Sequence, residues 1–428
     1  MTNFVVTSKC NFNCSFCFAA DHMKVQQGKI MSRKEFGDLL DFTGERIVSF
    51  CGGEPTLHPD FFTFLKMAKD NNRKVKILTN GLWNNEVLDN FTRFSAADFK
   101  NIWFSIHILP RNNYSATQMG NLLQTLELIK HQRVIFLVSF DCVNYDYSFV
   151  MELLRQYHVK KIVYSISVIK QTSFISQEEQ LTVWGNKIYS FIKECMDIDV
   201  VVENNCGFLP RCSFDENQIN YFKNCFLKMK TDPVKFHCKK ISLDLGSDNS
   251  SWRCFMFKDI WNLDIKKYRD FYHLYFHVYH RTKVLDQIMP FEKCYGCRYY
   301  LNEECGGGCH YYKINDNNTF EIQKLLNLTE EDISEELIPF INAEVLINKE
   351  GFFIDDYIGK INLGKNSLMT KVINYCDGIT TVGEIINKVK DEFEDHSSAK
   401  DDILSFLGKM SNYSAIIFKY PSSLESEK

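Results

Sequence analysis

The first 200 residues alternate between short apolar runs, rich in β-branched and aromatic residues, and longer amphipathic stretches with helical spacing. Six of the apolar runs are expected to be strands: Phe4–Thr7, Arg46–Phe50, Lys74–Leu78, Asn101–Ile106, Val134–Phe140 and Lys161–Ser167. Nearly continuous apolar strands that alternate with helices are typical of a parallel sheet covered on its faces. Six βα units are fewer than the eight of a complete barrel. The pattern therefore predicts an α/β fold with a partial (β/α)6 barrel over residues 1–202.

Composition limits the class of protein. The 428 residues suit two or three domains, and 45% hydrophobic with 24% charged residues is typical of globular chains. A net charge of -4 offers no electrostatic case for nucleic acid. We find neither an N-terminal targeting pattern nor an apolar run of the ~20 residues that a membrane helix needs. We expect a cytoplasmic protein without nucleic-acid or membrane partners, whose 16 reduced cysteines indicate metal or redox cofactors.

Three cysteines follow the first expected strand in a C-x3-C-x2-C spacing: Cys10, Cys14 and Cys17. Three thiols are too many for one disulfide and too few for a closed tetrahedral zinc site, so they suit a metal with one open position. The second strand ends in Gly52–Glu54, where two glycines permit close backbone approach and Glu54 supplies a carboxylate. Strand ends of a parallel sheet meet at one edge, so we expect one site. A partial zinc site, or three unrelated core thiols, is the alternative.

With Phe16 before the last cysteine and Gly-Gly-Glu-Pro after the second strand, residues 1 to about 200 resemble the radical S-adenosylmethionine (radical SAM) enzymes. The resemblance implies that the three cysteines hold three irons of a [4Fe-4S] cluster, while SAM chelates the fourth. It also implies cleavage of SAM to methionine and a 5′-deoxyadenosyl radical that abstracts a hydrogen from the substrate. The residues it implies at SAM are Phe16, Gly52, Gly53, Glu54, Ser105 and Asn144. For Ser105 and His107, ordinary structural roles stay open.

Nine of the cysteines lie between residues 203 and 314, and four of them run C-x2-C-x7-C-x3-C: Cys294, Cys297, Cys305 and Cys309. Together with four cysteines upstream (Cys206, Cys212, Cys238 and Cys254), this region resembles the SPASM domain, which carries auxiliary [4Fe-4S] clusters in peptide maturases. It departs from that family by a gap of seven where five is usual, and by the missing final cysteine. The resemblance implies one or two auxiliary clusters of unknown ligand allocation, one of which could keep an open iron. A structural zinc site is the alternative.

The C-terminal region returns to regular structure after an expected linker at 315–338. Residues 341–363 suggest a hairpin and a third strand, and Thr381-x-x-Glu384 is a capping-box pattern that begins a helix. Residues 339–421 resemble the PqqD-like module, a small winged-helix fold, and 422–428 are expected to be a tail. The resemblance implies recognition of a precursor-peptide leader by strand addition, with Lys360–Leu363 as the edge. DNA binding is the alternative, although "EIINKVKDEFED" is mixed to acidic.

These three regions predict an enzyme that modifies a ribosomally made precursor peptide and installs a crosslink, either a thioether or a C–C or C–N bond. Its expected partners are the precursor peptide, bound through its leader, and an electron donor such as flavodoxin or ferredoxin. Other possibilities stay open: a peptide epimerase, with Cys225 or Cys212 as hydrogen donor, a quinone-cofactor peptide maturase, and a sulfatase-maturing enzyme. Outside enzymology, the alternative is a zinc-binding winged-helix regulator.

Overall fold

The computed structural model describes residues 2–17, 19–20, 28–167, 178–238, 241–286, 288–314, 319–341, 345–348, 351–354, 359–361, 367–392, 399–412 and 415–421. The chain divides into two compact units. The first comprises Met1–Ile265 with Pro290–Tyr312, and the second comprises Lys266–Met289 with Lys313–Lys428. No helix in the described part of the chain is both long and apolar enough to cross a membrane. The finer division predicted from the sequence, into barrel, cysteine-rich domain, linker and C-terminal module, stays a prediction.

The first unit is built on a sheet in which seven successive strands run parallel. These are β1 (Thr2–Thr7), β2 (Ile47–Gly52), β3 (Lys74–Thr79), β4 (Ile102–His107), β5 (Arg133–Phe140), β6 (Lys161–Ile166) and β7 (Val201–Cys206). Three short strands extend the sheet beyond β1: β8 (Asp244–Leu245), β9 (Ser250–Trp252) and β10 (Leu263–Asp264). The predicted α/β fold with a parallel sheet is confirmed, and all six expected strands are present.

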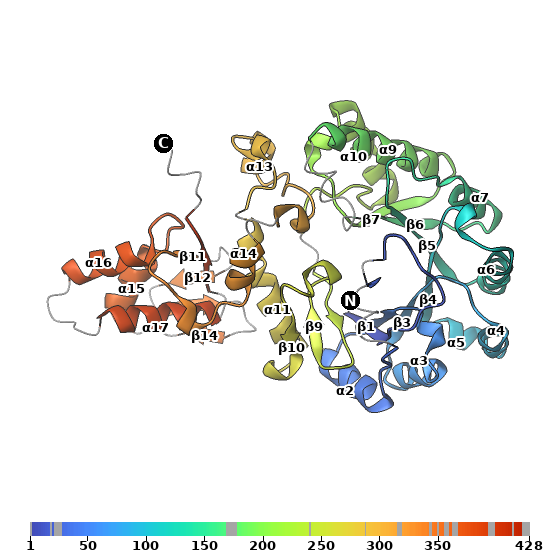
Figure 1. Cartoon of the computed structure of the whole chain (residues 1–428), viewed down its shortest axis with the longest axis horizontal. Coiled ribbons are helices and arrows are strands. Elements are labelled where there is room, and N and C mark those ends of the chain that lie inside the picture. Colours follow the sequence, from blue (N-terminus) through green and yellow to red (C-terminus); the bar gives the residue numbers. More distant parts are fainter. Residues whose placement is uncertain are drawn as a thin grey trace. The chain divides into compact units, whose positions relative to one another are not determined.

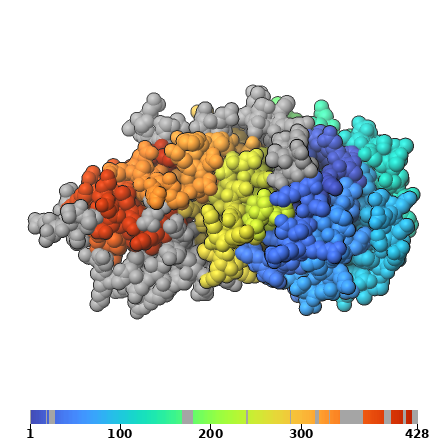
Figure 2. All heavy atoms as spheres, turned by 60° about the horizontal axis from the view of Figure 1, so that its bottom comes forward, coloured from blue at the N-terminus to red at the C-terminus, as the bar shows by residue number. Residues whose placement is uncertain are grey.

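Helices connect these strands and lie on the outer side of the curved sheet (Figure 1). They are α2 (Arg33–Thr43), α3 (Phe61–Asp70), α4 (Asn85–Thr92), α5 (Ala96–Phe99), α6 (Ala116–Ile129), α7 (Ser148–Gln156) and α9 (Glu178–Asp197), and α10 (Glu216–Met229) follows β7. The short helix α13 (Arg298–Leu301) comes later in the chain, after the last strand of this sheet. Figure 2 shows the blue-to-cyan residues of this part as a continuous outer surface.

Local sequence explains where these helices begin and what they bury. Ser32 and Glu35 form a reciprocal capping box that begins α2. On the buried face of α2, the ring of Phe36 stacks on Phe64 of α3 with centroids 4.2 Å apart, and it meets Phe50 of β2 edge-on at 5.4 Å. Such aromatic pairs add about 0.5–1.5 kcal/mol each beyond the area they bury. The α2–α3 layer is thereby fixed against the strand that leads into Gly52–Glu54.

Strand β7 was not among the strands expected from the sequence, which predicted a change of pattern after Val202. Its sequence, VVENNC, has only two apolar residues at its start, so it lacks the continuous apolar run of a buried strand. Asn204 is nonetheless buried, and its side chain donates to the carbonyl of Cys206 at 3.3 Å. Because β7 continues the parallel sheet, Cys206 lies at the carboxyl end of a strand.

Strand β8 places a carboxyl group inside the first unit. Asp244 is buried beside β1, where the side-chain amide of Asn3 donates to it at 2.7 Å. Burial raises the pKa of Asp244 to about 7, against which the bond from Asn3 acts only partly. The folded state therefore retains a proton that the unfolded state has lost above pH 4.

We expect this carboxyl group to make the protein less stable as pH rises from about 4 to about 7. In that window the folded state binds more protons than the unfolded state, so the free energy of unfolding falls with pH, by about 4 kcal/mol at most. Asp244→Asn should flatten that part of the profile and raise the melting temperature at pH 8 relative to the parent. Melting curves from pH 4 to 8 measure this, with Asp248→Asn on the exposed turn as the control; parallel profiles for parent and Asp244→Asn would contradict it.

The second unit contains two small sheets and several helices. Its helices are α11 (Phe271–Arg281), α12 (Lys283–Asp286), α14 (Thr319–Leu326), α15 (Ser367–Asn374), α16 (Val382–Glu392) and α17 (Ala399–Asn412). One sheet pairs β11 (Ile338–Ile341) with β15 (Ile416–Lys419), and the other has the order β12 (Val345–Asn348), β13 (Gly351–Ile354), β14 (Gly359–Ile361), all antiparallel.

The sequence patterns of this unit can be compared with its structure. The hairpin with a third strand is present, and Thr381 and Glu384 exchange the two hydrogen bonds of a capping box at 2.9 and 3.2 Å. Both patterns are confirmed, whereas the PqqD-like assignment stays a prediction. Part of the expected edge Lys360–Leu363, from Asn362 onward, lies outside the described residues. Helix α14 lies within residues 315–338, which were expected to be a linker. Its Ile322, Leu325 and Leu326 are buried, so this part of the expected linker is a packed helix.

Candidate functional site

The loop that carries Cys10, Cys14 and Cys17 follows β1 and is held by the turn after β2. Gly53 N donates to Thr7 O at 2.8 Å and Glu54 N donates to Lys9 O at 2.7 Å. Gly52 has a φ of +125°, and a Cβ on Gly53 would lie 2.0 Å from Lys9 O. Larger residues would therefore force the two loops apart. The two motifs singled out in the sequence are in direct backbone contact.

Glu54 joins three strand ends through one buried carboxylate. Its Oε1 accepts from Thr79 Oγ1 at 2.8 Å and from both the hydroxyl (2.7 Å) and the amide (3.2 Å) of Thr56, while Oε2 accepts from Asn80 N at 2.8 Å. Burial raises the pKa of Glu54, and these four donors oppose that rise. Asn80 also donates to Asn11 Oδ1 at 2.7 Å and approaches Cys10 Sγ at 3.9 Å. The carboxylate thus fixes the cysteine loop through Asn80.

The three thiols are close enough to influence one another's ionisation. Burial raises the pKa of Cys14 to about 12, and the neighbouring Cys17 and Cys10 add to the shift. Cys10 keeps contact with solvent, and burial raises its pKa less strongly, with Glu54 and Cys17 contributing. Thiols held together in this way resist ionisation unless a cation takes the charge, since a metal-bound thiolate is deprotonated. The role of the triad as a ligand set stays a prediction.

The remaining residues predicted at SAM lie around this loop. The ring of Phe16 packs against His107 with centroids 5.0 Å apart, at the end of β4. Ser105 Oγ and His107 Nε2 are both buried and, in the described part of the chain, have no hydrogen-bond partner. Burial lowers the pKa of His107 to about 4, so its ring is neutral at pH 7. Asn144 is exposed in the turn after β5.

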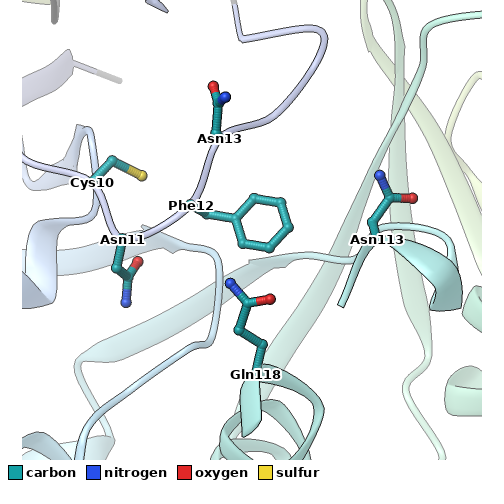
Figure 3. Close-up of a pocket in the computed structure, with 6 residues that line it drawn as sticks. All are labelled: Cys10, Asn11, Phe12, Asn13, Asn113 and Gln118. Carbon is teal, nitrogen blue, oxygen red and sulfur yellow. The ribbon is translucent and has the colours of Figure 1, made fainter. Parts of the chain in front are cut away.

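A cavity adjoins Cys10 at the open edge of the sheet. Figure 3 shows the ring of Phe12 extending from the cysteine loop toward the side of the cavity that carries Asn113 and Gln118, which lies in the first turn of α6. The full lining consists of Cys10, Asn11, Phe12, Asn13, Asn113 and Gln118. Apart from Phe12 and the thiol, these groups are amides, which both donate and accept hydrogen bonds. The cavity suits a polar molecule beside the thiols.

Residues 4–174 match the family model described as the radical SAM superfamily. This part of the chain is a radical SAM domain. The family implies SAM and a [4Fe-4S] cluster. In this domain, three adjacent thiols, a polar cavity beside Cys10, and two unpartnered buried polar atoms fit such a pair of groups. The predicted contacts of individual residues with SAM stay predictions.

Similar proteins share the radical SAM domain over limited lengths. An S-adenosylmethionine-dependent nucleotide dehydratase of Selenomonas ruminantium is 38% identical over 84 residues, which are 18% of this chain and 29% of that protein. A GTP 3′,8-cyclase of Synechocystis is 26% identical over 199 residues, 41% of this chain and 58% of that protein. The chain thus covers less than two thirds of either curated relative.

Among solved structures, Streptococcus suis SuiB bound to S-adenosylmethionine matches with a TM-score of 0.50 at 12% sequence identity, over 72% of each chain. At this identity the likeness concerns the fold, and it extends beyond the length matched by the radical SAM family model.

The cysteines of the region after β7 influence one another in two separate sets. A bond from Cys309 lowers the pKa of Cys238, and Cys206 and Cys254, whose pKa values burial raises to about 11 and about 12, both have Cys238 as a neighbour. Burial also raises the pKa of Cys294 to about 11, and its neighbours belong to the other set: Cys212, Cys297 and Cys305.

The two candidate hydrogen donors are in different places. Cys212 lies in the short turn η3 (Arg211–Ser213) beside Cys305, whereas Cys225 is buried on α10, where Tyr221 is its hydrogen-bond partner. Sequence reasoning did not identify Arg253, which is buried among the first set of cysteines. Its place directly before Cys254 was the available signal.

Proposed function

We propose that this protein is a radical SAM enzyme that modifies a ribosomally made precursor peptide and installs a crosslink, either a thioether or a C–C or C–N bond. The observation that carries the proposal is the joining of three elements in one chain. These are the triad held against Gly52–Glu54, eight of the nine cysteines at 206–309 (all but Cys225), and a C-terminal region with a three-stranded antiparallel sheet and helices. A bound cluster and SAM would supply a 5′-deoxyadenosyl radical, and the chain supplies positioning and exclusion of water.

The chain's own residues have defined tasks in this proposal. The triad holds the cluster, with Phe16, Gly52, Gly53, Glu54, Ser105 and Asn144 as contacts of SAM. The amide-lined cavity beside Cys10 admits the reacting part of the peptide. Residues 203–314 act as a SPASM-like domain that takes up the surplus electron, and 339–421 act as a PqqD-like module that binds the leader by strand addition. SuiB, whose fold the chain shares, has been crystallised with its precursor peptide SuiA.

The test is to combine the anaerobically purified protein with SAM, a reductant and the peptide encoded by the short open reading frame nearest its gene. A crosslink removes two hydrogens, so we expect the peptide mass to fall by about 2 Da while 5′-deoxyadenosine accumulates. A mass that is unchanged in H2O but rises by about 1 Da in D2O would identify an epimerase instead, and Cys212→Ala and Cys225→Ala would then locate the donor.

Two further outcomes would overturn the proposal. The curated relatives named above are a nucleotide dehydratase and a GTP cyclase. SAM cleavage that responds to a nucleoside triphosphate and not to the peptide would place this chain with them. Zinc without iron, together with DNA binding that weakens with salt, would favour the regulator.

A further inference from the structure

Eight of the nine cysteines of residues 206–309, all except Cys225 on α10, form two groups in space whose membership differs from their order in the chain. A parallel bridge pairs His237 with Gly308, and Gly308 N donates to Phe236 O at 3.2 Å. The residues that follow the bridge on the two segments are Cys238 and Cys309, which therefore lie side by side. Cys309 N donates to Phe208 O at 2.9 Å, which brings the segment after Cys206 to the same place. Three cysteines from distant parts of the chain thus meet at one bridge.

Arg253 brings the fourth cysteine to this group. Its Nη2 donates to the carbonyl of Cys238 at 2.6 Å and to Cys238 Sγ at 3.5 Å, and Cys254 is the next residue. We name this group, Cys206, Cys238, Cys254 and Cys309, the first thiol site.

The other four cysteines, Cys212, Cys294, Cys297 and Cys305, form the second thiol site. Arg211 N and Gly307 N both donate to Cys305 Sγ, at 3.3 and 3.4 Å, so the turn that carries Cys212 lies against Cys305. Cys297 N donates to Cys294 O at 3.2 Å, and Cys305 N donates to the carbonyl of Tyr299, two residues after Cys297, at 2.9 Å.

Contacts with neighbouring residues also hold the segments of the second thiol site together. A Cβ on Gly185 of α9 would lie 1.8 Å from Ser213 O, so only glycine lets α9 approach the turn that carries Cys212. The guanidinium of Arg211 lies over the ring of Tyr299, 3.7 Å from its centroid. These contacts hold the Cys212 turn against the segment of Cys297 and Cys305.

The buried guanidinium of Arg253 indicates that the first thiol site carries negative charge. Arg253 is only 3% exposed, and within the described residues no carboxylate pairs with it. Its Nε has no hydrogen-bond partner there, and its polar contacts are with Cys238. Burying a cation without a compensating negative charge costs several kcal/mol of folding free energy. Thiolates would supply the missing negative charge, and buried thiols become thiolates when they bind metal.

Four thiols gathered in each group match the usual ligand set of a [4Fe-4S] cluster, which is four thiolates. Four thiolates also suit a structural zinc ion, so the nature of the metal follows from the proposed function and is measured in the test below.

We propose that the first thiol site and the second thiol site each bind one [4Fe-4S] cluster through four cysteines. This rests on the proposed function for the nature of the cofactor, and it adds the allocation. Cys212 completes the second site in place of the final cysteine that the sequence lacks, and Cys238 completes the first. Every iron then has a protein ligand, so neither cluster keeps a vacancy for a substrate thiolate. Both clusters serve as electron carriers, and a substrate cysteine reacts without binding iron.

Iron, labile sulfide and zinc measured per chain would test this in full-length protein that lacks the triad (Cys10, Cys14, Cys17→Ala). That background is expected to keep about eight irons. The pair Cys238→Ala with Cys309→Ala removes two ligands of the first site and should leave about four irons. The pair Cys212→Ala with Cys238→Ala removes one ligand from each site and should leave almost none. Allocation in chain order, 206–254 against 294–309, predicts the reverse for both pairs.

A third double variant and EPR spectra of the reduced proteins allow the allocation to be tested even if one variant folds badly. Cys212→Ala with Cys305→Ala should leave about four irons, and its reduced EPR signal should complement that of Cys238→Ala with Cys309→Ala. Serine versions of each pair preserve side-chain size, and Cys195→Ala, in the buried face of α9, is the control that should lose no iron. Loss of all iron from both same-site pairs in folded protein would overturn the allocation. If the background protein holds zinc and no iron, the proposed function is wrong. The allocation can then still be tested, because a double variant within one site should lose one zinc and a double variant across both sites should lose two.

Discussion

Replacing Cys10, Cys14 and Cys17 together with alanine is expected to remove about four irons per chain and all cleavage of SAM, while the iron of residues 206–309 is kept. The reason is that the three thiols form one ligand set at the carboxyl edge of the sheet, separate from both later groups of cysteines. Iron and sulfide analysis, with chromatographic measurement of 5′-deoxyadenosine, gives the two readouts.

Cys142→Ala is the matched control, because Cys142 is an exposed cysteine in the turn after β5 and should affect neither readout. If the triple variant kept its full iron content, the triad would not be the ligand set. If the parent protein held iron but never cleaved SAM, a ligand role would survive and the enzymatic role would not.

Replacing Glu54 with alanine is expected to have the largest effect of any single substitution in the radical SAM domain. Four donors from Thr56, Thr79 and Asn80 would lose their acceptor inside the protein. Breaking a buried charged network of this kind costs about 3–5 kcal/mol, equivalent to roughly 10 °C in melting temperature for a domain of this size. Because Asn80 connects Glu54 with Cys10, we also expect faster loss of iron from the triad.

Thermal melting and iron release to a chelator measure the two effects. Glu54→Gln should be intermediate, because its amide oxygen can still accept from both threonines while its NH2 group faces Asn80 N. Glu203→Ala in β7, which removes partly exposed ion pairs with Lys161 of β6 and with Lys235, is the comparison and should cost less than about 1 kcal/mol. Equal melting temperatures for Glu54→Ala and Glu203→Ala would show that the carboxylate has no special structural role.

The parts of the fold with strong local signals could be predicted from the sequence. The six apolar strands follow directly from runs of β-branched residues, and the capping box of Thr381 and Glu384 follows from spacing alone. Strand β7 could not be predicted, because its second half is polar, and only Asn204 of that half is buried, where its side chain donates to the carbonyl of Cys206. Helix α14 was missed because the acidic residues that follow it dominate the composition of its segment.

The candidate site divides in the same way. The triad and Gly52–Glu54 are short motifs at strand ends, so their meeting could be predicted from the topology of a parallel sheet. The membership of the two thiol sites could not, because it depends on a backbone bridge between His237 and Gly308 across some 70 intervening residues. Arg253 was missed for a related reason: its significance lies in having no carboxylate partner among the residues that the structure describes, which no local pattern reveals.

The bridge between His237 and Gly308 joins cysteines that are synthesised at different times. Cys206 leaves the ribosome about 100 residues before Cys309, which at 5–20 residues per second is a delay of roughly 5–20 s. During that time neither group of four cysteines is complete, and the bridge from His237 to Gly308 cannot yet form. Cys305 and Cys309 then emerge almost together, so both quartets become complete within the same second. If the two thiol sites bind clusters as proposed, the cell must keep these thiols reduced throughout translation and deliver iron and sulfide only afterwards.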